Sequence, residues 1–137
     1  METIVVGYDH TEPSKRALER AVMLVRAFGA RLVITSVAPV VTSAAARAIG
    51  TDPGDTPAEH REELAAARAY LAGEGVEAEY VQAIGLAADS IVAAAEQHGA
   101  DLIVVGTREP GVLERLLGSS VSDAVSHRAH CDVLIVH

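Results

Sequence analysis

Short apolar runs alternate along this chain with longer segments whose apolar residues recur every three or four positions. Residues 3–8, 31–38, 101–105 and 132–136 are rich in Val, Ile and Leu, which is typical of buried strands. Residues 12–28 instead place apolar side chains on one helical face and charged side chains largely off that face. The alternation predicts an α/β fold.

A second helix is predicted from residue 56 to about residue 72. Thr56-Pro57-Ala58-Glu59 has the pattern of a capping box, with proline at the first helical position. Gly73 and Gly75 follow the apolar pattern, and we expect these two glycines to end the helix.

The remaining elements are shorter. Residues 76–82 alternate between apolar and polar, which predicts a half-exposed or edge strand. Residues 86–98 and roughly 120–129 have the spacing of two further helices. Residues 40–55 show no period, and a connection of this length is usually a functional flap or a mobile segment.

Five strands alternating with four helices predict one doubly wound domain over residues 1–137. Its three layers would be a parallel sheet and helices on both faces. Right-handed crossovers leave few topologies, of which strand order 3-2-1-4-5 is the simplest. That order reverses direction between the first and fourth strands, so a ligand is expected over the carboxyl ends of these two strands.

Composition excludes several classes of protein. A net charge of −8 repels phosphate backbones, which argues against nucleic-acid binding. No apolar run approaches the ~20 residues of a membrane span. Cys131 is the single cysteine, so there is no disulfide framework, and the chain is expected in the cytoplasm. The histidines lack metal-ligand spacing, and no catalytic group can be named.

The C-terminal quarter contains an arrangement that often holds a phosphate. A buried strand runs into Gly106, and a later helix opens on Ser119 and Ser120. Glycine allows a close backbone approach, and the free N–H groups of the first helical turn point at a bound anion. The serine pair is explained equally well by ordinary helix capping.

Two segments resemble the universal stress protein family. They are IVVGYDHTEPSKRALERAV near the start and GSSVSDAVSHRAHCDVLIV at the end. The resemblance implies the five-stranded fold and a homodimer. It also implies an adenine-nucleotide site in some members, marked by Gly-x-x-Gly, nine residues, then Gly-Ser/Thr. On this chain the three glycine positions hold Gly106, Glu109 and Ser119, so one glycine of three is kept.

The rest of the implied pocket maps onto residues near the strand ends. Gly7 and Tyr8 would lie beside the base and Asp9 near the ribose or adenine edge. Val37 and Val105 would form apolar walls, Arg108 and Ser120 would reach the phosphates, and Val121 would begin the last helix.

Three hypotheses about function follow. The first is a stress-response regulatory or protective protein whose degraded pocket binds ATP weakly or not at all. The second is a competent binder of ATP, ADP or AMP with slow hydrolysis. The third is a nucleotide-independent module that contacts an unidentified protein partner through residues 40–55. In each case we expect a homodimer through the apolar last strand, Asp132–Val136.

Overall fold

The structure, a computed structural model, describes most of the chain. It describes residues 1–38, 55–107 and 121–137, with side chains omitted at 37–38, 55–60 and 63. Most of the connection predicted at residues 40–55 therefore lies outside the described residues, as do Arg108, Glu109, Ser119 and Ser120.

The described residues form five strands and four helices. In chain order these are β1 Thr3–Gly7, α1 Glu12–Phe28, β2 Arg31–Ala38, α3 Asp55–Glu74, β3 Glu79–Ile84, α4 Ala87–His98, β4 Leu102–Gly106, α6 Val121–Arg128 and β5 Asp132–Val136. The strands make one parallel sheet in the order β3-β2-β1-β4-β5, which confirms the predicted order and the α/β fold.

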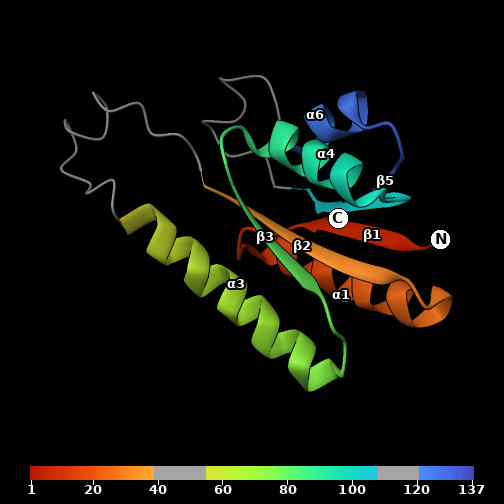
Figure 1. Cartoon of the computed structure of the whole chain (residues 1–137), viewed down its shortest axis with the longest axis horizontal. Coiled ribbons are helices and arrows are strands. Elements are labelled where there is room, and N and C mark those ends of the chain that lie inside the picture. The colour runs from red at the N-terminus through yellow and green to blue at the C-terminus, as the bar shows by residue number, and fades with distance from the viewer. Residues whose placement is uncertain (39–54, 108–120) are drawn as a thin grey trace.

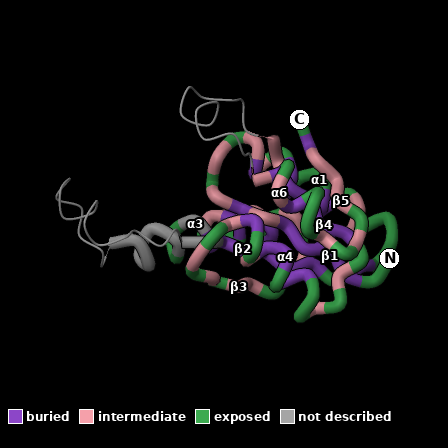
Figure 2. Tube along the Cα trace, turned by 90° about the horizontal axis from the view of Figure 1, so that it is seen from above, coloured by how far each residue is buried: buried purple, intermediate pink, exposed green. Residues whose placement is uncertain are grey.

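Helices cover both faces of this sheet (Figure 1). One buried cluster joins α1 and α3 to one face, and a second cluster joins α4 and α6 to the other. The central strands β1 and β4 are buried on both sides, as Figure 2 shows. Continuous apolar runs suit such doubly covered parallel strands.

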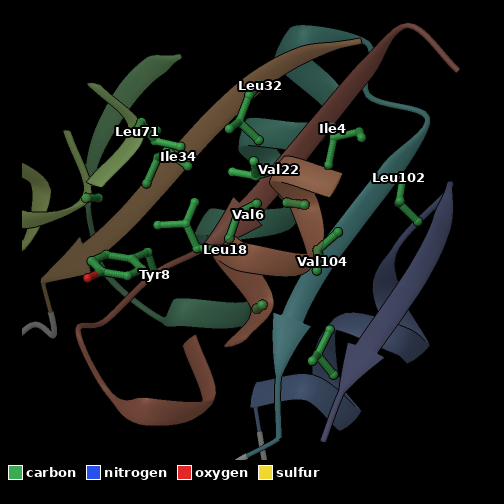
Figure 3. Close-up of a cluster of buried hydrophobic side chains, with 14 of the residues drawn as sticks. Ile4, Val6, Tyr8, Leu18, Val22, Leu32, Ile34, Leu71, Leu102 and Val104 are labelled. Carbon is green, nitrogen blue, oxygen red and sulfur yellow. The ribbon is translucent and has the colours of Figure 1, made fainter. Parts of the chain in front are cut away.

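Side chains alternate between these two faces along β1. Ile4, Val6 and Tyr8 belong to the cluster under α1 and α3, and Figure 3 shows Val6 and Tyr8 beside Leu18. Val5 belongs to the opposite cluster. Because successive strand residues point to opposite faces, Gly7 must face the α4 side, where it shapes the floor of the site described below.

Helix α1 begins and ends as its sequence predicts. The Thr11 side chain accepts a hydrogen bond from the backbone N–H of Ser14, at an N–O distance of 3.4 Å, and Pro13 lies in the first turn. At the other end Gly29 has φ of +66°, and its N–H donates to the carbonyl of Val25. The chain then turns directly into β2.

Helix α3 is longer than predicted, and the strand after it starts later. Gly73 lies inside the helix, and no described atom lies within 4 Å of the place a Cβ would take, so it was wrong to expect the helix to stop there. The turn is made by Gly75, at φ of +69°, and Val76 N–H donates to the carbonyl of Leu71. Val76 therefore caps the helix, and β3 begins only at Glu79, opposite Val33 of β2.

No helix within the three described ranges is both long enough and apolar enough to cross a membrane.

Candidate functional site

A cavity of about 100 Å³ lies at the carboxyl ends of β1 and β4, where the strand order reverses. This is the place that the topology predicts for a ligand. Six of the residues proposed from the sequence line it together: Gly7, Tyr8, Asp9, Val105, Gly106 and Val121. The turn between β1 and α1, the end of β4 and the first residue of α6 thus meet at one point, although they are far apart in the sequence.

The other proposed residues cannot be placed around this cavity. Val37 lies in β2 opposite Ala83, but its side chain is outside the described part of the chain. Arg108, Ser119 and Ser120 lie within residues 108–120, which the structure does not describe. Their proposed roles stay predictions from the sequence.

Gly106 lies against the first turn of α1. A Cβ added to Gly106 would come within 2.3 Å of the carbonyl oxygen of Pro13 and 2.4 Å of its carbonyl carbon. No real Cβ approaches backbone atoms so closely, and a backbone carbonyl cannot rotate away as a side chain can. The glycine is therefore required for α1 to pack on β4, whether or not a phosphate binds nearby.

A side chain at Gly7 would also collide with its neighbours, but these neighbours are side chains and not backbone. A Cβ at Gly7 would lie 2.7 Å from Cδ1 of Ile91 and 3.3 Å from Cγ1 of Val105. The nearest atom is the end of a flexible side chain, which can shift. The absent side chain allows Ile91 to seat closely on the sheet, and Ile91 forms part of the apolar wall of the cavity.

Asp9 shapes the turn between β1 and α1. Its Oδ1 accepts hydrogen bonds from the backbone N–H of Thr11, at 3.1 Å, and from the Thr11 hydroxyl. The Ser14 hydroxyl in turn donates to the carbonyl of Thr11, at 2.9 Å. Such a turn is typical of Asp. Asp9 therefore has a structural role in the turn in addition to lining the cavity.

Tyr8 is also explained largely by packing. Its side chain is 5% exposed and belongs to the core under α1 and α3, where Figure 3 shows it beside Leu18. Its hydroxyl lies 3.1 Å from Nδ1 of His10. His10 has φ of +65°, a left-handed conformation that only a few per cent of residues other than glycine adopt, although histidine is enriched among them.

Several lining residues were missed by sequence reasoning. Thr11 and Ser14 come from the start of α1, Ala87 and Ile91 from α4, and Thr35 from β2. The Thr35 side chain is fully buried, and its hydroxyl oxygen has no hydrogen-bond partner among the described residues. Thr35 directly follows the apolar run Leu32-Val33-Ile34, and a polar residue at this point of a buried strand was a usable signal.

The cavity combines apolar walls with a few polar groups. Val105, Val121 and Ile91 provide hydrocarbon surface, and Asp9 and Thr35 provide oxygen atoms. Within the part of the chain that the structure describes, no group of three or more His, Cys, Asp or Glu could hold a metal ion. This composition suits a small ligand that has apolar faces and a polar edge, as a nucleoside does.

The single cysteine lies apart from this cavity. Cys131 is partly buried in the cluster beneath α4 and α6. Burial raises the pKa of its thiol, and the neighbouring carboxylates of Asp132 and Asp101 raise that pKa further. A raised pKa disfavours the reactive thiolate, so the structure favours the prediction that Cys131 has a packing role.

Comparison with known proteins gives consistent matches over the whole chain. The model of the Universal stress protein family matches residues 1–137. Universal stress protein Rv1636 of Mycobacterium tuberculosis is 34% identical over 142 residues, covering 99% of this chain and 96% of that protein. Universal stress protein YxiE of Bacillus subtilis is 35% identical over 143 residues, covering 97% of each.

Solved structures agree with these matches. A universal stress protein crystallised in complex with cAMP superposes with a TM-score of 0.77 at 30% identity, covering 99% of this chain and 97% of that one. UspA from Lactobacillus plantarum superposes with a TM-score of 0.80 at 20% identity, covering 99% and 97%, which shows the shared fold.

Proposed function

This chain belongs to the universal stress protein family, and we propose that it acts there as a stress-response regulatory or protective protein with an altered adenine-nucleotide pocket. In this proposal the pocket keeps affinity for the nucleoside part of a nucleotide and has lost most of its affinity for a triphosphate. The cytoplasm is the proposed location.

The observation that carries the proposal is the cavity where the strand order reverses. It brings together Gly7, Asp9, Val105, Gly106 and Val121, the residues expected around an adenine nucleotide from the family resemblance. A protein 30% identical to this chain was crystallised with cAMP, which also contains adenosine. These two facts together support an adenosine-sized ligand.

One feature argues against a tightly bound triphosphate. Glu109 replaces a motif glycine. Its charge, at 4 Å from a phosphate, would cost about 1 kcal/mol in water-like surroundings and about 4 kcal/mol at an effective dielectric of 20.

Calorimetric titration of the purified protein with AMP and with ATP tests this proposal. We expect measurable AMP binding and ATP binding at least ~10-fold weaker, because only the longer phosphate chain must pass the altered motif. Mass spectrometry of small molecules released on denaturation provides a second readout. Tight ATP binding, or stoichiometric ATP in the freshly purified protein, would establish the competent ATP binder instead.

The competent binder is the second candidate, and one observation favours it. Gly106 and Asp9, which both belong to the implied nucleotide site, line the same cavity at the strand ends. A pocket that retains these groups needs little further change to accept ATP if the Glu109 carboxylate points into solvent.

We also propose a homodimer that pairs through β5. This strand, Asp132–Val136, lies at an edge of the sheet and is hydrogen-bonded to β4 on one side. Its residues Val133, Leu134 and Ile135 are only partly buried. An apolar edge strand readily pairs with a second copy of itself.

Light scattering after gel filtration should therefore give a mass of about 29 kDa, twice the 14.3 kDa of one chain. The mass should hold on dilution into the low micromolar range, and hydrogen exchange should be slow along β5. A monomer mass of 14.3 kDa at all protein concentrations would contradict the proposed dimer.

A further inference from the structure

Thr35 presents a polar group that the described part of the fold leaves without a partner. Its side chain is 0% exposed, its hydroxyl oxygen has no hydrogen-bond partner there, and the residue lines the cavity. Buried hydroxyl groups are nearly always hydrogen-bonded, because leaving one unpaired is destabilising. An unpaired hydroxyl in a cavity wall therefore needs an explanation.

Thr3 shows how the same residue type is treated elsewhere in this sheet. It is 1% exposed, and its Oγ1 accepts a hydrogen bond from Nη2 of Arg31 at 2.9 Å. Both threonines lie in strands of the central sheet and both are buried. The fold supplies a partner for Thr3, whereas Thr35 has none among the described residues and lies at the cavity.

The position of Thr35 indicates which part of a ligand it would meet. It lies in β2 directly opposite Gly7 of β1, where the absent side chain lets Ile91 of α4 seat closely on the sheet. Gly106 lies beyond β1, in β4. Adjacent strands are about 4.8 Å apart, so Thr35 lies roughly 10 Å from Gly106 across the sheet.

The two ends of the cavity differ in chemistry along this direction. At the β4 end Val121 starts α6, and a helix N-terminus favours negative charge. At the β2 end Thr35 offers one hydroxyl next to the apolar side chains of Ala87 and Ile91 of α4. A phosphate suits the first end, and a flat base with a hydrogen-bonding edge suits the second.

We propose that the Thr35 hydroxyl is a specificity-determining contact that hydrogen-bonds the edge of the adenine base. This inference rests on the proposed function, because it assumes that the cavity receives an adenine nucleotide. A hydroxyl both donates and accepts, so it pairs with either the ring nitrogens or the exocyclic amino group. Without ligand the hydroxyl stays unpaired and weakens the fold.

The test uses Thr35→Val, which keeps the shape of the side chain and removes the hydroxyl, with AMP as the probe. We expect Thr35→Val to bind AMP at least ~10-fold more weakly than wild type in calorimetry. The same variant should have a higher Tm in the absence of ligand, because an unpaired buried hydroxyl is gone. A role in packing alone does not predict this opposite pair of effects.

Two further variants act as controls. Thr35→Ser keeps a hydroxyl and should bind AMP within ~3-fold of wild type. Thr3→Val removes a hydroxyl that is already paired, so it should lower Tm and leave AMP affinity within ~2-fold of wild type. We therefore expect Thr35→Val and Thr3→Val to shift Tm in opposite directions, and only Thr35→Val to weaken AMP binding.

The outcomes separate this inference from the proposed function. If wild type binds AMP and Thr35→Val binds it equally well, the inference is wrong and the proposed function stands. If wild type binds neither AMP nor ATP, the proposed function falls and the inference falls with it. If Thr35→Val loses AMP binding and gains a higher Tm, while wild type and the two control variants still bind AMP, the result supports both the inference and the proposed function.

Discussion

Gly106→Ala is expected to destabilise the protein by about 3 kcal/mol, because the new Cβ would meet the backbone of Pro13 at 2.3–2.4 Å. Overpacking a core usually costs ~1–3 kcal/mol, and the upper end applies where the neighbour is backbone and cannot rotate away. The first turn of α1 would have to lift from β4. Urea unfolding monitored by circular dichroism measures the change in free energy of unfolding.

Gly73→Ala is the matched control for this prediction. Gly73 lies inside α3, and a Cβ added there would have no described atom within 4 Å. Alanine there should stabilise the protein by ~0.5–1 kcal/mol, since glycine disfavours a helix interior. A Gly106→Ala protein as stable as wild type would show that the α1–β4 contact is not tight, and the proposed structural role of this glycine would be wrong.

The second large effect is expected on ATP affinity. Replacing Glu109 and Ser119 together by glycine should strengthen ATP binding by ~10- to 1000-fold. The change removes a negative charge beside the expected phosphate position. It also removes any strain at residue 109, worth about 1–2 kcal/mol if that residue needs a positive φ. Calorimetric titration with ATP and AMP measures the gain for each nucleotide.

Single variants separate the two causes. Glu109→Gln removes the charge and keeps the side chain, so it should give only the electrostatic part of the gain. Glu109→Gly should add the conformational part. AMP affinity should change far less than ATP affinity in each variant. If the double variant binds ATP no better than wild type, residues 109 and 119 are not the obstacle, and the altered-motif explanation is wrong.

The sequence was sufficient for the order of the strands because each rule behind it is local or topological. Apolar runs marked β1, β2, β4 and β5, and right-handed crossovers left few ways to arrange them. The boundaries between α3 and β3 were harder. Gly73 and Gly75 are equivalent as sequence signals, and only the pairing of Glu79 with Val33 of β2 shows where the strand begins.

Some residues of the site were predicted correctly, but the structure gives them roles that the sequence did not indicate. Gly106 was selected for its place in a nucleotide motif, yet its contact with Pro13 joins residues far apart in the chain and cannot be read from a local pattern. Thr35 was missed for the same reason. Its hydroxyl lacks a partner among the described residues. Whether a buried hydroxyl is paired depends on all of its neighbours in space, and these cannot be identified from the sequence alone.

The central place of β1 has a consequence for how the protein is made. β1 pairs on one side with β2, which leaves the ribosome soon after it, and on the other with β4, where Ile4 meets Leu102. During synthesis the half-sheet β3-β2-β1 can assemble under α1 and α3 while the second edge of β1 stays open. An open apolar edge invites wrong pairing in a nascent chain. The interval before β4 emerges is therefore when the second edge of β1 is exposed to such pairing.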